Sequence, residues 1–466
     1  MTAFHNWKLR ALLSTILLCF AHYSYSQPRP LSLVEYVATL KNHMPSILGK
    51  KAQLNQAQAG VADTRHSFLP NAFIGDQINL GTDNSLPGSY LSYGIIPSTS
   101  SGLHSSNNYQ SAVGNIAIFQ SQYLLFDFGL KKARMGQAKA LVNLSQRDLD
   151  RETYLLEWQT CKLYFEILRN QFQLAIDRQN VLRNEAIFSV IEAVTRSGIK
   201  PGADSSLAIA ELSKSRTIYN QTLGRAKQMQ QQMSYLTGIP ADQVEVDTSQ
   251  AKNYLATLRV IAAGSYADSG NNPLTAYYAS RKLLDLQNEE LVKKSYLPRV
   301  FLTATAWARG SSIDYNNEYK ALSEGLGYQR FNYLAGATMV YDLFNGLHRK
   351  DKLTESHFGI MASDFDLQQQ ELNIRNIGLQ ADEAIQTAIK NLLEVPIQIR
   401  SSEDTYNQKT AQYKAGIISL IDLTNASFVL YRAQTDYVET LSDWLLANLD
   451  KAASTGNIES FIQSIK

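Results

Sequence analysis

The chain repeats itself, and this duplication limits the folds that it can adopt. Two prolines, Pro45 and Pro70, recur 228 residues later as Pro273 and Pro298. Three further pairs recur at an offset of 218, and they are Phe126 with Phe344, Gly198 with Gly416, and Asp204 with Asp422. A constant offset through residues that end helices and strands indicates one structural unit used twice. Each unit is far longer than a solenoid repeat, so we interpret it as a duplicated half of one domain.

The first 26 residues have the pattern of an export signal. Lys8 and Arg10 give a positive start, residues 11–20 form an apolar stretch, and Ser24-Tyr25-Ser26 is a small-x-small cleavage site. The apolar stretch is much shorter than the roughly 20 residues that a membrane-spanning helix needs. We therefore expect residues 1–26 to be a signal peptide that is removed on export.

Composition and motifs exclude several classes of function. The 44 basic and 42 acidic residues nearly balance, which gives no reason to expect a nucleic-acid partner. Beyond the signal peptide only Cys161 remains, so an intrachain disulfide is not possible. The sequence has no phosphate-binding glycine loop, no zinc-binding His-Glu-x-x-His and no Gly-x-Ser-x-Gly, and its histidines are scattered. We expect no enzyme activity, no cofactor and no metal site.

Hydrophobic periodicity predicts the same order of elements in both units: helix, strand, loop, strand, long helix, tip turn and returning helix. In the first unit we expect helix at 31–67 with a break near Pro45, strands at 71–80 and 109–125, a long helix at 129–196, and a return to about 236. In the second we expect helix at 273–296, strands at 299–309 and 328–341, a long helix at 347–414, and a return to about 449. The expected divisions are a first unit at 27–240, a linker at 241–267 and a second unit at 268–466. Because proline disfavours helix in the residue before it, Pro70 and Pro298 mark the helix-to-strand junctions.

Each long helix carries a seven-residue repeat. At 1.5 Å per residue, its length corresponds to a rod of roughly 100 Å. The repeated positions are Tyr154, Cys161, Leu168, Ala175 and Leu182 in the first helix, and Leu353, Ile360, Leu367, Ile374, Ala381, Ala388 and Val395 in the second. A sustained heptad predicts paired, supercoiled helices. Pro396 is expected to kink or locally unwind the second rod.

Four strands do not close into a barrel on their own, because small membrane barrels begin at about eight strands. In an exported protein the open edges have to be paired by other copies of the chain. Two copies give eight strands, and three copies give twelve. A barrel of twelve strands is wide enough for a lumen. Aromatic residues gather at both ends of the strands, as in the interface belts of membrane proteins. They are Phe68, Phe73, Tyr123, Phe126, Phe128, Tyr296, Phe301, Tyr341 and Phe344 at one end, and Tyr109, Trp307, Tyr328 and Phe331 toward the other.

Five segments, in order along the chain, resemble the TolC family of outer-membrane efflux and secretion channels. They are Ala59–Pro70, Leu124–Ala133, Arg196–Leu212, Tyr341–Lys350 and Tyr413–Leu430. The resemblance implies a mainly α fold with a small β part, in which three copies form a 12-stranded barrel in the outer membrane continuous with a periplasmic α-helical barrel. It also implies docking of the helical tips onto a periplasmic adaptor protein that is fed by an inner-membrane transporter.

The resemblance further implies which residues close the entrance at the tips. Tyr413 matches a tyrosine that bonds to an aspartate, here Asp204, and Ile418 stands where the family has a second bonding residue, an arginine. A pair of aspartates that lines the aperture matches Asp422 and Asn425, so one member of the pair is neutral here.

The same residues also have local explanations that do not need the family. An aspartate in the first turn of a helix, as expected for Asp204 and Asp422, caps free backbone N–H groups. Gly198 and Gly416 permit the positive φ that ends a helix. Tyr413 in the last turn of a rod is explained by packing alone.

From the sequence we expect the passive outer-membrane exit duct of a tripartite efflux pump or type I secretion system, in the cell outer membrane of a Gram-negative bacterium. The alternative is an exported helical scaffold or adhesin without a pore. Such a rod has no need of four strands with aromatic ends, and a stand-alone porin has no need of two long helices.

Overall fold

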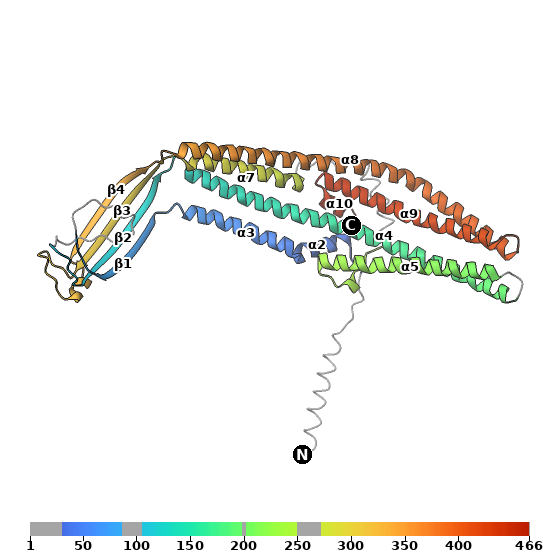
Figure 1. Cartoon of the computed structure of the whole chain (residues 1–466). Coiled ribbons are helices and arrows are strands. Elements are labelled where there is room, and N and C mark those ends of the chain that lie inside the picture. The colour runs from blue at the N-terminus through green and yellow to red at the C-terminus, as the bar shows by residue number, and fades with distance from the viewer. Residues whose placement is uncertain (1–29, 86–104, 198–201, 249–271, 466) are drawn as a thin grey trace, which may run out of the picture. The chain divides into compact units, whose positions relative to one another are not determined.

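The computed structural model describes residues 30–85, 105–197, 202–248 and 272–465. The signal peptide, Gly198 and residues 249–267 of the expected linker lie outside the described residues. The first half of the chain contains α2 (Leu33–His43), α3 (Pro45–His66), β1 (Asn71–Gly81), β2 (Ala112–Phe126), α4 (Leu130–Arg196), α5 (Gly202–Thr237) and the short 3-10 helix η1 (Ala241–Gln243). The second half contains α7 (Pro273–Ser295), β3 (Arg299–Ser311), η2 (Leu322–Leu326), β4 (Arg330–Val340), α8 (Asn345–Lys414), α9 (Leu420–Ser454) and α10 (Ile458–Ser464). Figure 1 shows these elements, and the predicted duplicated order of helix, two strands, long helix and returning helix is confirmed.

The chain divides into two compact units. The strand unit consists of Leu54–Ser145 and Ser280–Phe365, and it holds the four strands with the helical segments that enter and leave them. The hairpin unit consists of the residues up to Gln53, Gln146–Ala279 and the chain from Asp366 onward. It holds the two hairpins α4–α5 and α8–α9 together with α2 and α10.

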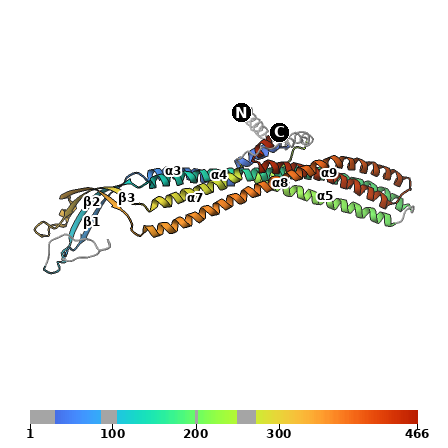
Figure 2. The ribbon, with the colours of Figure 1, turned by 90° about the horizontal axis from the view of Figure 1, so that it is seen from above.

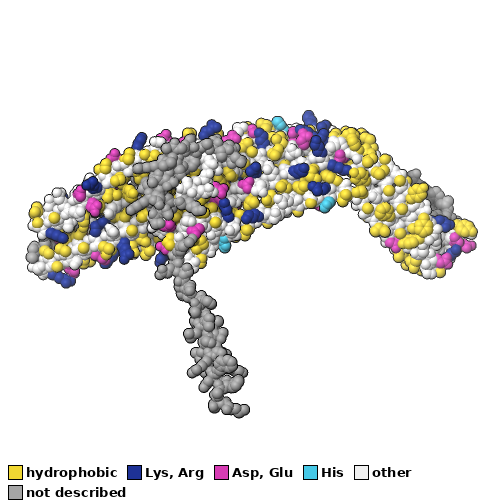
Figure 3. Space-filling view, turned by 180° about the vertical axis from the view of Figure 1, so that it is seen from behind, with side chains coloured by type: hydrophobic (Ala, Val, Ile, Leu, Met, Phe, Trp, Pro, Cys, Tyr) yellow, Lys and Arg dark blue, Asp and Glu magenta, His cyan; other side chains and the backbone are white. Residues whose placement is uncertain are grey.

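The strand unit is an antiparallel sheet in the order β1-β2-β3-β4, so β1 and β4 are its two edges. The register separates its side chains by polarity. One face, which we call the apolar face, includes Ala72, Ile74, Ile78, Leu80, Phe119, Tyr123, Leu302, Ala304, Ala306, Ala308, Phe331, Tyr333, Ala335, Ala337 and Met339, with Asp76, Asn115 and Ser121 as its polar members. The opposite face, the polar face, includes Gln77, Asn79, Gln120, Gln122, Thr303, Thr305, Arg309, Arg330, Asn332 and Thr338, and its apolar members include Phe73, Ile116, Ile118, Phe301, Trp307 and Leu334. In Figure 3 hydrophobic side chains cover much of the strand region that faces the viewer.

The register also corrects the expected aromatic belts. Trp307 pairs with Ile118 and Asn332, and Phe73 pairs with Gln120, so these two aromatic side chains lie on the polar face. Phe301 lies on the same face as Trp307, because residues two apart in a strand share a face. For these three residues a place in a lipid-facing belt is wrong, because closeness to a strand end says nothing about which face a residue occupies, whereas Tyr123 and Phe331 do lie on the apolar face.

Both helix-to-strand junctions have the same form. α3 ends at His66 and α7 at Ser295, and the backbone N–H groups of Leu69 and Leu297 each donate to a carbonyl three residues earlier, at 3.0 and 3.3 Å. A proline then precedes the first residue of β1 and of β3.

The double replacement Pro70→Leu/Pro298→Leu is therefore expected to let α3 and α7 run on. A shift of one residue exchanges the apolar and polar faces of a strand, so we expect loss of assembled protein from the membrane fraction, measured on a native gel. Wild-type levels of assembled protein would show that these prolines do not set the register.

The core of the hairpin unit lies where α4, α9 and α10 meet α2. Its largest fully buried side chains include Trp444, Tyr36, Tyr164, Phe165 and Phe461. The rings of Phe165 and Phe461 meet edge-on, with centroids 6.1 Å apart, so the short C-terminal helix α10 closes this core. None of the helices within the described ranges has a stretch apolar and long enough for a transmembrane span.

The predicted heptads agree with the structure along α8 and along part of α4. Every predicted position of α8 is buried or half-buried, but in α4 only Tyr154, Cys161 and Leu168 are buried, while Ala175 and Leu182 are exposed. The expected local unwinding at Pro396 is wrong, because α8 stays helical through this residue. A kink there stays a prediction. Proline removes one N–H bond to the carbonyl of residue 392, and the buried side chains of Leu392 and Val395 hold the helix in place there.

Candidate functional site

The turn between α8 and α9, residues 415–419, is shaped by its own sequence. Gly416 has φ +73°, its N–H donates to the carbonyl of Tyr413 at 3.0 Å, and the N–H of Ile417 donates to that of Gln412 at 3.0 Å. This pattern is a Schellman motif, which ends a helix with glycine in the left-handed conformation. The predicted conformational reason for Gly416 therefore agrees with its geometry.

A capping box then starts α9. The Ser419 hydroxyl accepts from the N–H of Asp422 at 3.3 Å, and the Asp422 carboxylate accepts from the N–H of Ser419 at 3.1 Å. The hydrogen bonds from the Ser419 hydroxyl and backbone hold the pKa of the Asp422 carboxyl below its usual range. Asn425 lies one turn further on and is exposed.

The α4–α5 tip lies at the same end of the hairpin unit, as Figures 1 and 2 both show. Asp204 is half-exposed in the first turn of α5, where its charge interacts favourably with the helix dipole. Gly198, which we predicted to end α4, is outside the described residues.

The two tips meet in a small apolar cluster. Ile191 of α4, Ala208 of α5 and Leu420 of α9 are buried together, and Tyr413 packs against them from the end of α8. Burial and the nearby charge of Asp204 raise the pKa of the Tyr413 hydroxyl. Asp204 thus lies close enough to Tyr413 to act on it electrostatically, and the hydrogen bond that the resemblance implies stays a prediction. Ile418 is half-buried in the turn.

Solved structures with the same architecture identify the fold. The outer membrane protein VceC of Vibrio cholerae matches with a TM-score of 0.73 at 14% identity, over 91% of this chain and 96% of VceC. The outer membrane channel CmeC of Campylobacter jejuni matches with 0.71 at 12% identity, over 93% and 89% of the two chains. The fold is that of the TolC family.

A third match is the open state of the MtrE outer membrane channel of Neisseria gonorrhoeae, with a TM-score of 0.67 at 13% identity over 92% of this chain and 90% of MtrE. Neither a protein-family model nor a curated protein sequence matches this chain. The likeness to the TolC family therefore lies in the fold and in short segments rather than in overall sequence.

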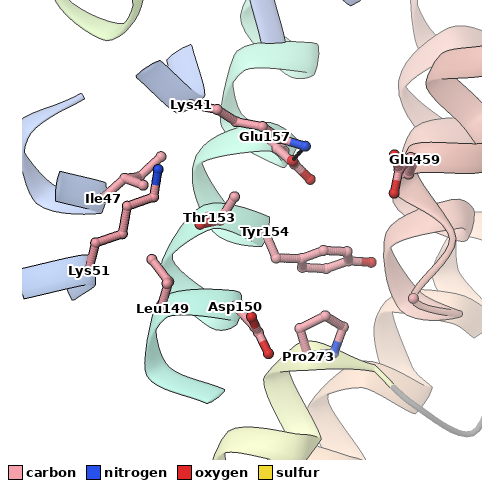
Figure 4. A pocket seen from close by; sticks show the side chains of 11 residues that line it. Lys41, Ile47, Lys51, Leu149, Asp150, Thr153, Tyr154, Glu157, Pro273 and Glu459 are labelled. Atoms are coloured by element: carbon pink, nitrogen blue, oxygen red, sulfur yellow. Dashed lines mark ion pairs between the residues drawn. The ribbon is translucent and has the colours of Figure 1, made fainter. Parts of the chain in front are cut away.

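A cavity of about 370 Å³ lies between α2, α3, α4, α7 and α10 of this TolC-like fold (Figure 4). The Lys41 ammonium pairs with the Glu157 carboxylate at 2.6 Å, and the Tyr154 hydroxyl donates to the carbonyl of Ala453 at 2.7 Å. Burial raises the pKa of the Glu157 carboxyl, and that of the Tyr154 hydroxyl as well. The described groups that line the cavity include no nucleophile hydrogen-bonded to a base, and we assign it no catalytic chemistry. The described residues also contain no cluster that would hold a metal ion.

Sequence reasoning missed a polar row inside the hairpin unit. Asn170, Asp177 and Asn184 are buried at seven-residue spacing in α4, in line with Ile191 of the tip cluster. The seven-residue spacing is visible in the sequence, but a heptad is recognised by its apolar residues, and these residues are polar.

Proposed function

We propose that this chain is the outer-membrane exit duct of a tripartite efflux pump or type I secretion system. Three copies close their sheets into a 12-stranded barrel in the outer membrane, and their helices form a passive tunnel in the periplasm. The hairpin tips form the entrance and dock onto a periplasmic adaptor protein fed by an inner-membrane transporter. VceC, CmeC and MtrE are outer membrane proteins with the same fold.

The separation of apolar and polar side chains on the sheet carries this proposal. A membrane barrel needs one face for lipid and one for a wet lumen, and this alternation is its sequence signature. The strands of 11 to 15 residues are long enough to span a bilayer when tilted. A helical scaffold without a pore would have no use for an apolar face whose tyrosine at position 333 is 87% exposed.

Both edges of the sheet are free to pair with further copies. The edge strands β1 and β4 have 11 residues each and are exposed throughout. If β1 of one copy pairs antiparallel with β4 of the next along its full length, Asn79 lies opposite Asn332, and Ile78 lies opposite Tyr333. Residues of the same face then stay on the same side of the sheet. This register continues both the lipid-facing and the lumen-facing surfaces around the barrel.

The helices beside these edges carry complementary surfaces. Along α3, next to β1, the exposed residues Asn55, Ala59 and Ala62 follow a heptad spacing and are small. Along α8, next to β4, Phe358 and Met361 follow a heptad spacing and are large and exposed. Large side chains fit between small ones on a facing helix, so the α8 row of one copy is suited to the α3 row of the next.

Cysteine pairs test the arrangement of copies. We expect Asn79→Cys/Asn332→Cys to give disulfide-linked ladders that end at three copies, because the two positions face each other across neighbouring edges. In the control, Asn79→Cys/Tyr333→Cys, the cysteines lie on opposite faces and should cross-link poorly. The native Cys161 is fully buried and should not interfere. Equal yields in the two variants would contradict the register, and a ladder that ends at two copies would contradict the 12-stranded barrel.

A further inference from the structure

Basic side chains gather where the helices of the strand unit meet the sheet. The last ten residues of α3 and α7 and the first ten of α4 and α8 are 57–66, 286–295, 130–139 and 345–354, and we call them the basic collar. The collar holds ten Lys and Arg but four Asp and Glu, whereas the whole chain has 44 and 42. Its Lys and Arg are Arg65, Lys131, Lys132, Arg134, Lys139, Lys293, Lys294, Arg349, Lys350 and Lys352. On the face shown in Figure 3, dark-blue side chains gather on the helices next to the strand region.

Most of this positive charge is not neutralised by the chain itself. Six exposed members form no ion pair within the described ranges, and they are Arg65, Lys132, Arg134, Lys139, Arg349 and Lys350. Two of the four acids of the collar, Glu289 and Glu290, both pair with Lys293, at 2.9 and 2.8 Å. The remaining charge is therefore free to attract an anionic partner.

The stability of the helices does not explain this charge. At the ends of α3 and α7 the helix dipole favours basic residues, so those positions have a local reason. At the starts of α4 and α8 the dipole favours acidic residues, yet neither first turn contains one. Lys131, Lys132 and Arg134 therefore lie where their own helix disfavours them, which indicates a use outside the helix.

Lys131 connects the collar to the apolar face of the sheet. Its ammonium lies 4.6 Å from the centre of the Tyr123 ring and donates to the carbonyl of Leu124 at 2.8 Å. Tyr123 belongs to the apolar face, so Lys131 lies at the end of the surface that the proposed function places against lipid. Arg134 follows on the same side of α4, because residues three apart in a helix are neighbours on its surface.

The four helix ends can meet one membrane leaflet together. α3, α4, α7 and α8 join the sheet at the same end, as Figures 1 and 2 show. Ten helical residues extend about 15 Å from the sheet. This length covers the layer of roughly 5 to 8 Å that lipid headgroups occupy on each side of a bilayer.

We propose that the basic collar is a binding surface for anionic phospholipid headgroups in the leaflet on the helical side of the barrel. Arg134 and Lys131 contact the headgroup phosphate, while the acyl chains continue along the apolar face beyond Tyr123. The attraction acts over about 8 Å at physiological salt, so the other basic side chains of the collar add to it. The place of the lipid rests on the proposed function, whereas the preference for an anionic headgroup rests on the charge of the collar.

The proposed assembly increases the need for such a partner. When α8 of one copy packs on α3 of the next, Arg349 and Lys350 come near Arg65 of the neighbouring copy. Like charges repel, and the collars of three copies form one basic ring. Anionic headgroups between the copies offset this repulsion.

Native mass spectrometry of the delipidated full chain in detergent tests the proposal. The probes are phosphatidylglycerol, which carries a negative charge, and phosphatidylethanolamine, which has no net charge, with the same acyl chains. We expect the wild type to bind phosphatidylglycerol at least tenfold more tightly. Arg134→Gln should weaken phosphatidylglycerol binding about fivefold, the contribution of one basic residue near an anionic surface. It should leave phosphatidylethanolamine binding unchanged.

Two variants serve as controls. Arg134→Lys keeps the charge and should bind phosphatidylglycerol like the wild type. Arg400→Gln makes the same replacement at an exposed arginine of α8 in the hairpin unit, outside the collar, and should also have no effect. Sodium phosphate should displace no more phosphatidylglycerol than sodium chloride of equal ionic strength, because a lipid surface is not a site for a free anion.

Several results would overturn the proposal. They are equal binding of the two lipids by the wild type, unchanged phosphatidylglycerol binding in Arg134→Gln, loss of binding in Arg134→Lys, or the same loss in Arg400→Gln. Specific displacement by phosphate would assign the collar to a free anion, and displacement by purified peptidoglycan would assign it to the cell wall. A preference for phosphatidylglycerol in a chain that forms no conducting channel would support the collar and contradict the proposed function. A conducting channel without the preference would do the reverse.

Discussion

The variant Phe358→Asp is expected to abolish assembly of the chain into its membrane form. Phe358 is 63% exposed in the single chain. It belongs to the row of α8 that we place against the row of small residues on α3 of the next copy. Burying an aspartate there, without a partner, costs on the order of 3 kcal/mol or more per copy. Three symmetric contacts multiply this cost. Size-exclusion chromatography of the detergent extract should show only single chains.

The neighbouring residue provides a matched control. His357 is exposed and lies about 100° around the helix from Phe358, so His357→Asp adds a similar charge outside the proposed contact. It should assemble like the wild type. Normal assembly of Phe358→Asp, or equal loss in both variants, would contradict the proposed packing of α8 on α3.

The second large effect is expected at the tips. The resemblance implies that Tyr413 donates a hydrogen bond to Asp204. Burial and the charge of Asp204 both raise the pKa of the Tyr413 hydroxyl. Removing one hydrogen bond costs about 1 kcal/mol, so Tyr413→Phe in three copies costs about 3 kcal/mol and shifts a closed–open equilibrium about a hundredfold. Single-channel conductance in planar bilayers should rise for Tyr413→Phe and for Asp204→Ala.

Because Ile418 cannot form the second bond implied by the family, we expect the wild type to open more easily and this rise to be smaller. Asn407→Ala is the control, because Asn407 of α8 is exposed and is not part of the tip cluster. If Tyr413→Phe and Asp204→Ala both conduct like the wild type, these residues only cap and pack the tips.

Most elements of the fold could be predicted because proline, glycine and periodicity act locally. The junctions at Pro70 and Pro298, the return at Gly416 and the two long helices follow from backbone conformation and hydrophobic spacing. The short helix α10 was missed, since seven residues give too little periodicity to recognise.

What could not be predicted depends on neighbours that are distant in the sequence. The buried row of α4 passes from apolar residues to Asn170 and Asp177. Asn170 donates to the carbonyl of Thr222, and Asp177 accepts from the hydroxyls of Thr222 and Tyr431, so both are bonded by residues of other helices. The face occupied by Trp307 likewise depends on strand register. At the tips, the first-turn positions of Asp204 and Asp422 and the helix-ending turn at Gly416 could be predicted from local sequence, whereas the roles of Tyr413 and Asp204 in closing an entrance stay predictions.

Planar-bilayer recording of the purified assembly tests the central claim most directly. The account predicts discrete conductance steps for the wild type, larger steps for the double variant Tyr413→Phe/Asp204→Ala, and none for Phe358→Asp. Purified assemblies of the wild type and of the double variant that insert into the bilayer without conducting would contradict a channel.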